Sequence, residues 1–400
     1  NTFDEIIWSP GVPHSYPVPH PIAQEAKKVG VRIKSDIDLL FQGQNKASYY
    51  CISGTNGKST TTVMVAHILK NAGKNIQVGG NLGRAVLDLE PLGHDGIYIL
   101  EISSFQSELL QNFKPTISAL LNISPDHIDR HGSMDGYVNA KAQLFKSQSQ
   151  GSIAIINDDD EYCRNIKSMI LRNSKLEVIS ISVDHKVTNG IFVESNILKD
   201  SFFEKNYELD LSVFNHLYGR HNNQNIAFAY TISKICGIKI EEIIDSLSSF
   251  HGLSHRQEIV GQYSNILFIN DSKATNWASA LQALSSYNNI YWVAGGISKG
   301  SYPEDFKLYS KNIKKAFLIG QSANEISDFL NNKNIPNIIH SSLEDATLNA
   351  WEQANRDNNT QSTILLSPAC ASMDMFKNFE ERGEAFVSYV KKSFLGNLND

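Results

Sequence analysis

The feature of this sequence that most constrains its fold is the glycine-rich stretch Gly-Thr-Asn-Gly-Lys-Ser-Thr at residues 54–60. An apolar, strand-like run at residues 49–52 precedes it, and a helix-like run at residues 61–70 follows it. A glycine loop between a strand and a helix turns successive backbone N–H groups toward one point, where the helix dipole adds positive potential. The sequence therefore predicts a polyphosphate site, with Lys58 at the outer phosphates and the Ser59 or Thr60 hydroxyl at Mg²⁺.

The loop matches the general phosphate-loop pattern G-x-x-x-x-G-K-[ST] only in part, because the first glycine of the pattern falls on Ile52. An alternative interpretation is a glycine-rich turn that only caps a helix with Ser or Thr. The preceding strand, the lysine and the hydroxyls together favour a nucleotide site. Its expected residues are Gly54, Thr55, Asn56, Gly57, Lys58, Ser59 and Thr60.

Composition limits the classes of protein to which the chain can belong. Its net charge is −6 and no block of Lys and Arg stands out, which argues against a general nucleic-acid-binding protein. The four cysteines are far apart and form no C-x-x-C pair, as expected for reduced thiols rather than a disulfide framework or a zinc site. No apolar run reaches the ~18 residues of a membrane helix, and no signal peptide is recognisable. We therefore expect a cytoplasmic protein with no nucleic-acid or membrane partner. A monomer is our default expectation for its oligomeric state.

Strand-like and helix-like runs alternate along most of the chain, which predicts an α/β fold with parallel-rich sheets. For a central domain at residues 43–252, strands are expected at 49–52, 76–78, 97–100, 117–121 and 153–156, edge strands and loops at 183–210, and two helices at 221–250. For a second alternating domain at residues 253–400, strands are expected at 266–269, 290–294, 316–319 and 364–366, and helices at 322–330 and 343–353. Residues 1–42 are rich in proline and too poor in apolar periodicity to bury a core, so we interpret them as the remnant of a further domain.

Two candidate metal ligands follow strands of the central domain. Glu101 ends an apolar strand beside the phosphate loop, where a carboxylate is well placed to hold Mg²⁺. The alternative for Glu101 is a solvated residue at a strand end. His127 follows the next strand, and its place near the expected nucleotide makes a metal or phosphate role as plausible as a structural one. Lys141, in contrast, lies in an amphipathic helical pattern that by itself predicts a solvated surface lysine.

The C-terminal domain carries two further polar stretches at strand ends. Asp271, Lys273, Thr275 and Asn276 are bunched after one strand and resemble a second phosphate half-site, to which Arg256 adds a fixed cation. The alternative is a helix N-cap beside an exposed lysine. After the last strand, Ser372 can cap a helix and offer its hydroxyl and N–H to an anion. Cys370 lacks a visible His and Asn arrangement, so we interpret it as a small buried residue.

Taken together, these motifs resemble the Mur ligase family of ATP-dependent amide-bond-forming enzymes. The phosphate loop is shared with related enzymes such as the folylpolyglutamate synthases, whereas several other stretches resemble the D-glutamate-adding members in particular. These are SPGVP at 9–13, GGNLG at 79–83, EISSFQ at 101–106, GRHNNQN at 219–225, NDSKATN at 270–276 and LLSPACAS at 365–372. The resemblance covers nearly the whole chain, in order. It implies a Rossmann-like N-terminal domain for a UDP sugar, a phosphate-loop ATPase and a Rossmann-like C-terminal domain.

The resemblance also implies an activity and a set of site residues. The activity is ligation of D-glutamate to UDP-N-acetylmuramoyl-L-alanine through an acyl phosphate, with ATP and Mg²⁺. Metal ligands would be Ser59, Glu101, His127 and a carbamate formed on Lys141. Contacts to ATP outside the phosphate loop would come from Asn222, Asn225, Arg256, Asp271 and Lys299. Substrate contacts would come from Asn81, Ser103, Lys273, Thr275, Ser372, Met373 and Phe379.

Two other functions remain as alternatives at this point. The first is a ligase for a different amino acid or for a folate, against which the LLSPACAS stretch argues. The second is a phosphate-loop nucleotide switch or binding module, whose hydrolysis would not depend on any amino acid. A switch does not need the polar stretches of a second domain, which makes it the weaker alternative.

Overall fold

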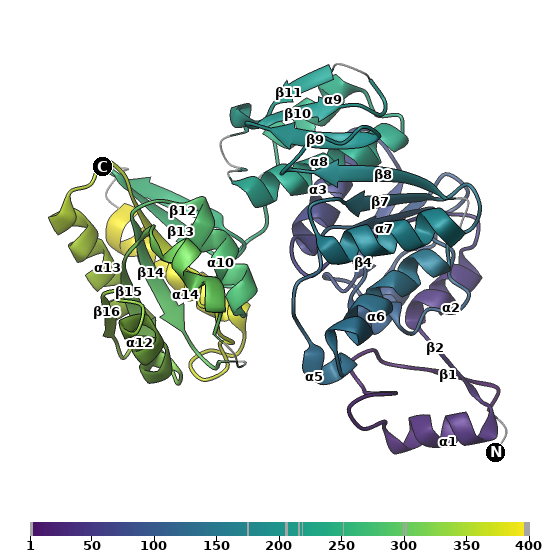
Figure 1. Ribbon diagram of the computed structural model, residues 1–400, viewed down its shortest axis with the longest axis horizontal. Helices are drawn as coiled ribbons and strands as arrows, with labels where there is room; N and C mark the ends of the chain where they lie inside the picture. The colour runs from purple at the N-terminus through teal and green to yellow at the C-terminus, as the bar shows by residue number, and fades with distance from the viewer. Residues whose placement is uncertain are drawn as a thin grey trace. The chain divides into compact units, whose positions relative to one another are not determined.

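The computed structural model describes residues 3–173, 176–204, 207–214, 217, 219–250, 252–298, 300 and 302–395. The chain forms two compact units, Asn1–Phe250 and His251–Asp400. Both units are built on parallel-rich sheets covered by helices, as the alternating sequence pattern predicts (Figure 1).

The first unit begins with a small α/β segment. Strand β1 (Glu5–Ile7) pairs in parallel with β2 (Arg32–Lys34), and α1 (Pro21–Val29) lies between them in the chain. Its small apolar cluster contains the buried residues Trp8 and Ala23, which pack with Leu109, and the partly buried Ile6, Val12 and Ile33. Helix α1 begins with Pro21, a residue that fits the first helical turn because its missing N–H has no intrahelical partner there.

The main sheet of the first unit has nine strands in the order β11-β10-β9-β8-β7-β6-β3-β5-β4. The strands are β3 (Ser48–Ser53), β4 (Ile76–Gly80), β5 (Ile97–Glu101), β6 (Ile117–Leu120), β7 (Ile153–Asn157), β8 (Glu177–Ser182), β9 (Gly190–Glu194), β10 (Ile197–Asp200) and β11 (Tyr207–Asp210). Pairing is parallel from β4 to β9 and antiparallel for β10 and β11. Strands within residues 183–210 are therefore confirmed, but of these only β11 lies at an edge of the sheet, and β8 is not among the predicted strands.

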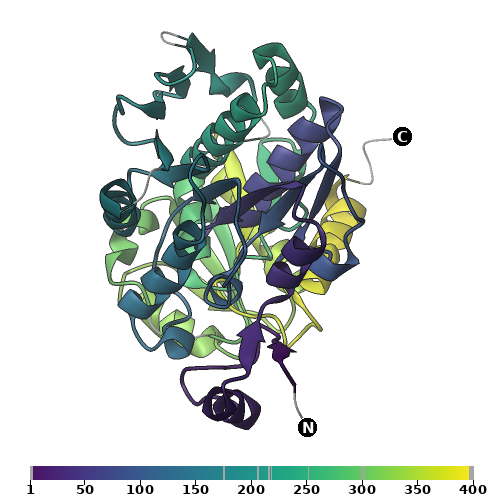
Figure 2. The same cartoon turned by 90° about the vertical axis from the view of Figure 1, so that its right-hand side faces the viewer.

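Helices cover both faces of this sheet (Figure 1 and Figure 2). They are α2 (Asp36–Gly43), α3 (Lys58–Asn71), α4 (Ser104–Ser107), α5 (Ile128–His131), α6 (Met134–Lys146), α7 (Glu161–Asn173), α8 (Arg220–Ile235) and α9 (Ile240–Ser248). Alternate residues of each central strand enter different cores: in β3, Tyr50 and Ile52 pack with α3 and α8, whereas Tyr49 and Cys51 pack toward α2 and α6. Burial on both faces explains why these strands appear as continuous apolar runs in the sequence.

The second unit is a six-stranded sheet in the order β12-β13-β17-β14-β15-β16, parallel except for β12. Its strands are β12 (Glu258–Tyr263), β13 (Ile266–Asn270), β14 (Ile290–Gly295), β15 (Ile313–Ile319), β16 (Asn337–Ile339) and β17 (Ser362–Leu366). Its helices are α10 (Trp277–Ser286), α11 (Lys307–Ser310), α12 (Ala323–Asn331), α13 (Leu343–Asp357) and α14 (Phe379–Val390). The first three helices share one apolar cluster with the sheet, and α13 and α14 share the other. In the part of the chain that the structure describes, no helix is long and apolar enough to cross a membrane.

Candidate active site

The glycine-rich stretch forms the connection between β3 and α3, in the middle of the nine-stranded sheet. Gly57 precedes α3 with a φ of 81°, and a Cβ added there would lie 2.6 Å from Oδ1 of Asn225. Both the backbone angle and the close approach therefore require glycine. Lys58 folds over the loop, where its ammonium donates to the carbonyl oxygens of Gly54 (2.9 Å) and Thr55 (2.8 Å). The predicted strand–loop–helix is present, and the backbone N–H groups of the loop lie at the N-terminus of α3.

Asn122, two residues after the end of the neighbouring strand β6, holds the loop in place. Its Oδ1 accepts hydrogen bonds from the N–H groups of Asn56 (2.8 Å) and Thr55 (3.2 Å), and its Nδ2 donates to the carbonyl of Asn56 (3.1 Å). The sequence analysis gave this residue no role. The sequence pattern that could have indicated a role for Asn122 is its place just after a parallel strand, at the edge where such sheets bind ligands.

Glu101 is the last residue of β5 and is only 2% exposed. Its two carboxylate oxygens accept hydrogen bonds from Oγ of Ser59 (2.5 Å) and from Nδ2 of Asn81 (2.7 Å). The alternative of a solvated strand-end residue is therefore wrong, because β5 lies between β3 and β4 and the residues after both neighbours cover its end. The structure thus brings Ser59, Asn81 and Glu101 together.

Lys141 is 1% exposed, so the surface lysine predicted from the helix pattern is wrong. It lies one turn after Tyr137 on the buried face of α6, and its ammonium is 4.8 Å from the centroid of the Tyr137 ring. The ammonium donates a 2.7 Å hydrogen bond to the carbonyl of Gly54 in the phosphate loop. Burial, followed by the nearby positive charge of Lys58, lowers the pKa of Lys141 well below its usual range.

His127 precedes the short helix α5 with a left-handed backbone (φ 53°), and its side chain is 44% exposed. Its Nε2 lies 3.4 Å from a carboxylate oxygen of Asp126, and its ring centroid lies 4.9 Å from that of Phe105. Among the described residues, no three His, Cys, Asp or Glu side chains form a metal site. Mg²⁺ usually retains several waters and takes one or two carboxylates plus phosphate oxygens, so Glu101 beside a phosphate loop fits this ion without such a cluster.

The N-terminal end of α8 lies against the beginning of α3. Oδ1 of Asn225 accepts from Oγ1 of Thr61 (3.1 Å), and Nδ2 of Asn225 donates to Oδ1 of Asn222 (3.2 Å). This contact places the two expected ATP-binding asparagines next to the phosphate loop. Ser103, in contrast, caps α4: its Oγ accepts from the N–H of Gln106 at 3.2 Å.

In the second unit, Asp271 is buried directly after β13. Its carboxylate accepts a hydrogen bond from Oγ of Ser367 (2.8 Å) and one from the N–H of Gln257 (3.2 Å). Burial raises the pKa of Asp271 to about 7, and the hydrogen bond from Ser367 and the charge of Arg256 only partly oppose this. The helix N-cap in this stretch is Asn276, whose side chain accepts from the N–H of Ser279 at 2.9 Å.

Other expected acceptor-site residues lie around the same edge of the second sheet. The Lys273 ammonium is 3.7 Å from the centroid of the Phe379 ring, which brings these two predicted residues together. Ser372 is buried and its carbonyl accepts from the N–H of Phe376 at 2.9 Å, whereas Met373 is 70% exposed. Cys370 is buried as expected, and burial raises the pKa of its thiol to about 11. Lys299 lies outside the described residues.

Arg382 is a buried residue that the sequence analysis missed. Its guanidinium donates to Oγ of Ser272 (2.9 Å), to the carbonyl of Ser272 (2.8 Å) and to the carbonyl of Cys370 (3.1 Å). It therefore joins the loop after β13 to the loop after β17. In the sequence, it follows two glutamates in an apparently polar helix start, a pattern that does not indicate burial.

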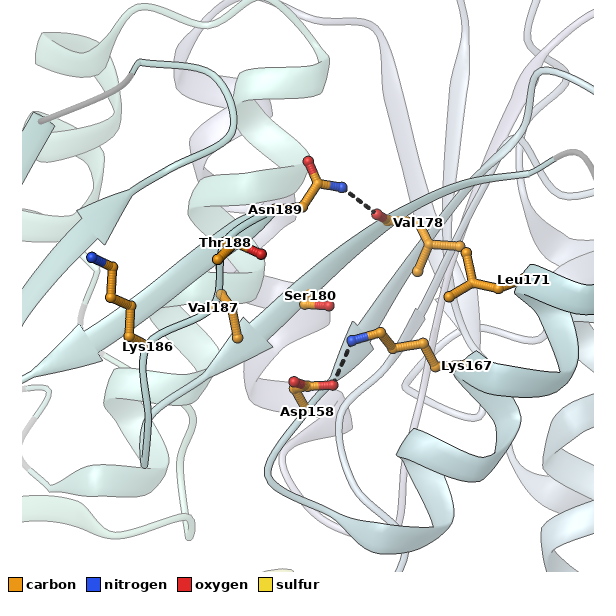
Figure 3. Close-up of a pocket in the computed structure, with 9 residues that line it drawn as sticks. All are labelled: Asp158, Lys167, Leu171, Val178, Ser180, Lys186, Val187, Thr188 and Asn189. Atoms are coloured by element: carbon orange, nitrogen blue, oxygen red, sulfur yellow. Dashed lines mark hydrogen bonds and ion pairs between the residues drawn. The ribbon is translucent and has the colours of Figure 1, made fainter.

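A cavity of about 310 Å³ lies elsewhere in the first unit, between β7, α7, β8 and the loop before β9. Figure 3 shows two polar contacts within its lining. The Lys167 ammonium lies 2.6 Å from the Asp158 carboxylate, and Nδ2 of Asn189 donates to the carbonyl of Val178 at 3.2 Å. This cavity contains none of the predicted site residues.

Comparisons with known proteins agree with this geometry. The Mur ligase middle domain family matches residues 52–233. A Caulobacter vibrioides protein named UDP-N-acetylmuramoylalanine–D-glutamate ligase is 41% identical over 395 residues, covering 97% of this chain and 83% of the relative. A Rickettsia felis protein of the same name is 42% identical over 389 residues, covering 97% and 84%.

Solved structures of related ligases share the fold. UDP-N-acetylmuramate-alanine ligase MurC from Thermotoga maritima matches with a TM-score of 0.62 at 18% identity, covering 98% of this chain and 86% of that one. MurF from Acinetobacter baumannii matches with a TM-score of 0.64 at 17% identity, covering 89% and 79%.

Proposed function

The chain belongs to the Mur ligase family, and we propose that it ligates D-glutamate to UDP-N-acetylmuramoyl-L-alanine with ATP, in cytoplasmic synthesis of a peptidoglycan precursor. One structural observation supports the proposal independently of sequence similarity. The buried carboxylate of Glu101 accepts hydrogen bonds from the Ser59 hydroxyl at the end of the phosphate loop and from Asn81. A carboxylate in that position suits a reaction that moves phosphate with the help of a divalent cation.

The chemistry explains why such an enzyme needs ATP. A carboxylate resists nucleophiles because it is negatively charged and has no good leaving group. In the first step a carboxylate oxygen of the muramoyl substrate forms a bond to the γ-phosphorus, and ADP leaves. In the second step the D-glutamate amine attacks the acyl carbon, the C–O bond to phosphate breaks, and phosphate leaves as the nitrogen loses a proton. Both steps gather negative charge, which cations and N–H donors stabilise.

We assign the phosphate-handling role to the first unit. The loop N–H groups and Lys58 would hold the ATP phosphates, with Asn222 and Asn225 beside them. Ser59, Glu101 and His127 would hold Mg²⁺, which when bound neutralises phosphate charge and acts as a Lewis acid. Asn81 and Ser103 would contact the muramoyl substrate, with Asn81 oriented by its bond to Glu101.

A carbamate on Lys141 is the second part of this assignment. Burial lowers the pKa of Lys141, and this shift favours the neutral, nucleophilic form of the amine. Attack on CO₂ forms an N–C bond and releases one proton, which leaves an anionic carbamate. The modification would convert this buried amine, which otherwise donates only to the carbonyl of Gly54 among the described residues, into an oxygen ligand for Mg²⁺.

We assign the acceptor role to the second unit. Lys273, Thr275, Ser372, Met373 and Phe379 would bind D-glutamate, whose two carboxylates need fixed donors. Arg256, Asp271 and Lys299 would contact ATP. We accordingly propose a central ATP domain at residues 43–252, an acceptor domain at 253–400, and a segment of a UDP-substrate domain at 1–42. We also propose that the enzyme acts as a monomer.

The test is phosphate release with ATP, Mg²⁺ and UDP-N-acetylmuramoyl-L-alanine, comparing D-glutamate with L-glutamate, L-alanine, L-lysine and no amino acid. Release that requires both D-glutamate and the muramoyl nucleotide supports the proposal. Release that ignores the amino acid indicates a plain ATPase, and release with another amino acid indicates a different ligase. If no release occurs, binding of ATP and of UDP-N-acetylmuramoyl-L-alanine is measured separately by calorimetric titration, which separates a failure to bind the muramoyl nucleotide from a wrong assignment.

A further inference from the structure

The carboxylate of Glu108 lies close to three basic side chains, which come from two distant parts of the first unit. It immediately follows α4, the short helix after β5, and its carboxylate is half-buried. Arg130 donates from Nη2 to Oε1 of Glu108. His131 places Nδ1 3.5 Å from Oε2, and His14 of the N-terminal segment places Nδ1 3.4 Å from Oε1.

The guanidinium of Arg130 depends on this carboxylate as its counter-charge. It is buried, and its Nε and Nη1 find no hydrogen-bond partner among the described residues. Within the same residues, Glu108 is the one carboxylate at ion-pair distance from its guanidinium. A buried guanidinium without a counter-charge is costly, so removing the charge of Glu108 would drive Arg130 out of its position.

A second layer of contacts joins the same two turns. Nε2 of His131 lies 2.9 Å from Oγ of Ser104, in the first turn of α4. The ring of Phe105 lies 4.9 Å from the His127 ring and 5.2 Å from the centre of the Arg130 guanidinium. Helix α4 is thereby tied to α5, and α5 begins directly after His127.

We propose that Glu108 is a positioning residue for the ligase reaction: it fixes the turn at residues 127–131, and with it His127, to the turn that follows Glu101. The proposal rests on the function proposed above, in which Glu101 and His127 hold Mg²⁺. Glu108 itself touches neither metal nor substrate. Its 3.4 Å contact with His14 brings the N-terminal segment to the same point.

The test uses the full chain with Glu108→Gln, which keeps the shape and removes the charge. The first readout is hydrogen exchange in the metal-free protein. We expect the amides of Arg130, His131 and Gly132, which now donate to the carbonyls of His127 and Ile128, to exchange about tenfold faster or more. The second readout is the Mg²⁺ concentration for half-maximal phosphate release, which we expect to rise about fivefold or more while kcat at saturating Mg²⁺ falls less.

Glu194→Gln is the matched control, because Glu194 pairs with Lys199 at the other end of the sheet and its loss should change neither readout. Wild-type exchange at residues 130–132 in Glu108→Gln overturns the proposal. If that variant unfolds, Glu108→Asp is used instead. Its side chain keeps the negative charge but is one methylene shorter, so the carboxylate lies farther from Arg130. Wild-type exchange at residues 130–132 in Glu108→Asp also overturns the proposal. Hydrogen exchange is measured without substrates, so its result does not depend on the proposed function. If the wild-type chain showed no D-glutamate-dependent turnover, the proposed function would fail, but the exchange result would still test the role of Glu108.

Discussion

At the scale of single residues, Lys141 departs furthest from what its local sequence indicates. Replacing it with alanine removes the buried amine that donates to Gly54 and that we propose to carry a carbamate. We expect Lys141→Ala to lower kcat about 100-fold or more, since one oxygen ligand to the metal and the fixed loop contact are both lost. Millimolar acetate or formate should restore part of the activity, because a small carboxylate can take the place of the carbamate. Phosphate release over a carboxylate titration measures both effects.

Lys146→Ala is the control for this experiment, since Lys146 is an exposed lysine at the end of the same helix. It should turn over normally and gain nothing from added carboxylate. Near-normal activity of Lys141→Ala would remove the carbamate from the proposed function. Loss of activity with no rescue would leave Lys141 as a loop contact alone.

Asp271 carries a prediction about pH. Its pKa is about 7 in the folded chain, above the usual value of 3.8, because the carboxyl is buried. Between pH 4 and pH 7 the folded state therefore binds more protons than the unfolded state, and this group makes the free energy of unfolding fall as the pH rises. The shift corresponds to at most about 4 kcal/mol across that window.

Asp271→Asn keeps the acceptor for Gln257 and a polar partner for Ser367 but cannot ionise. We expect this variant to gain stability relative to wild type as the pH rises from 4.5 to 7.5. Urea unfolding at several pH values, followed by a probe in the second unit such as Trp292, measures the difference. Parallel stability curves for the two proteins would show that Asp271 ionises normally.

At the scale of elements, α3 offers a matched pair of glycines for testing the phosphate loop. Gly57 precedes the helix and Gly73 follows it, with left-handed φ angles of 81° and 72°. A Cβ on Gly57 meets Oδ1 of Asn225 at 2.6 Å, whereas a Cβ on Gly73 has nothing within 4 Å. Both alanine variants should lose about 1 kcal/mol of stability from backbone strain. Only Gly57→Ala should weaken ATP binding, by about tenfold or more, because the loop must move away from α8.

Calorimetric titration with a non-hydrolysable ATP analogue, together with Tm, separates the two effects. Equal ATP affinity in Gly57→Ala and Gly73→Ala would mean that the close contact with Asn225 does not shape the site.

The elements also show how far the sequence could lead. The central strands β3, β5 and β14 were predictable because residues of both faces are buried, which makes each strand a continuous apolar run. Strands β12 and β16 lie at sheet edges and helix α14 is polar on one side, so they lack that signal. The same limit applies to the site. The position of Glu101 at the end of an apolar strand predicts it as a site residue. The burial of Lys141 and Arg382 is visible only in the fold, because each lies on a helix whose polar residues look exposed in the sequence.

At the scale of the whole molecule, the proposed division of labour between the two units can be tested through Arg382. Burial lowers the pKa of its guanidinium to about 10, yet it makes three hydrogen bonds to the loops that carry Lys273 and Ser372. Arg382→Gln cannot span Ser272 and Cys370 at once, so the two loops should separate. These loops carry the proposed D-glutamate contacts Lys273 and Ser372, whereas most of the proposed ATP contacts, including the phosphate loop, lie in the first unit. The two substrates should therefore respond differently.

We expect the KM for D-glutamate to rise about tenfold or more in Arg382→Gln and the KM for ATP to change less than about threefold. The unfolding transition of the second unit should move to lower temperature, because a buried hydrogen-bonded cation is lost. Steady-state kinetics with each substrate varied in turn, combined with calorimetry, provides both measurements. Arg356→Gln is the control, since Arg356 is an exposed arginine of the same unit that pairs with Glu352. An equal loss for ATP and D-glutamate would argue that these two loops do not hold the acceptor separately from the nucleotide, and the assignment of D-glutamate binding to them would have to be abandoned.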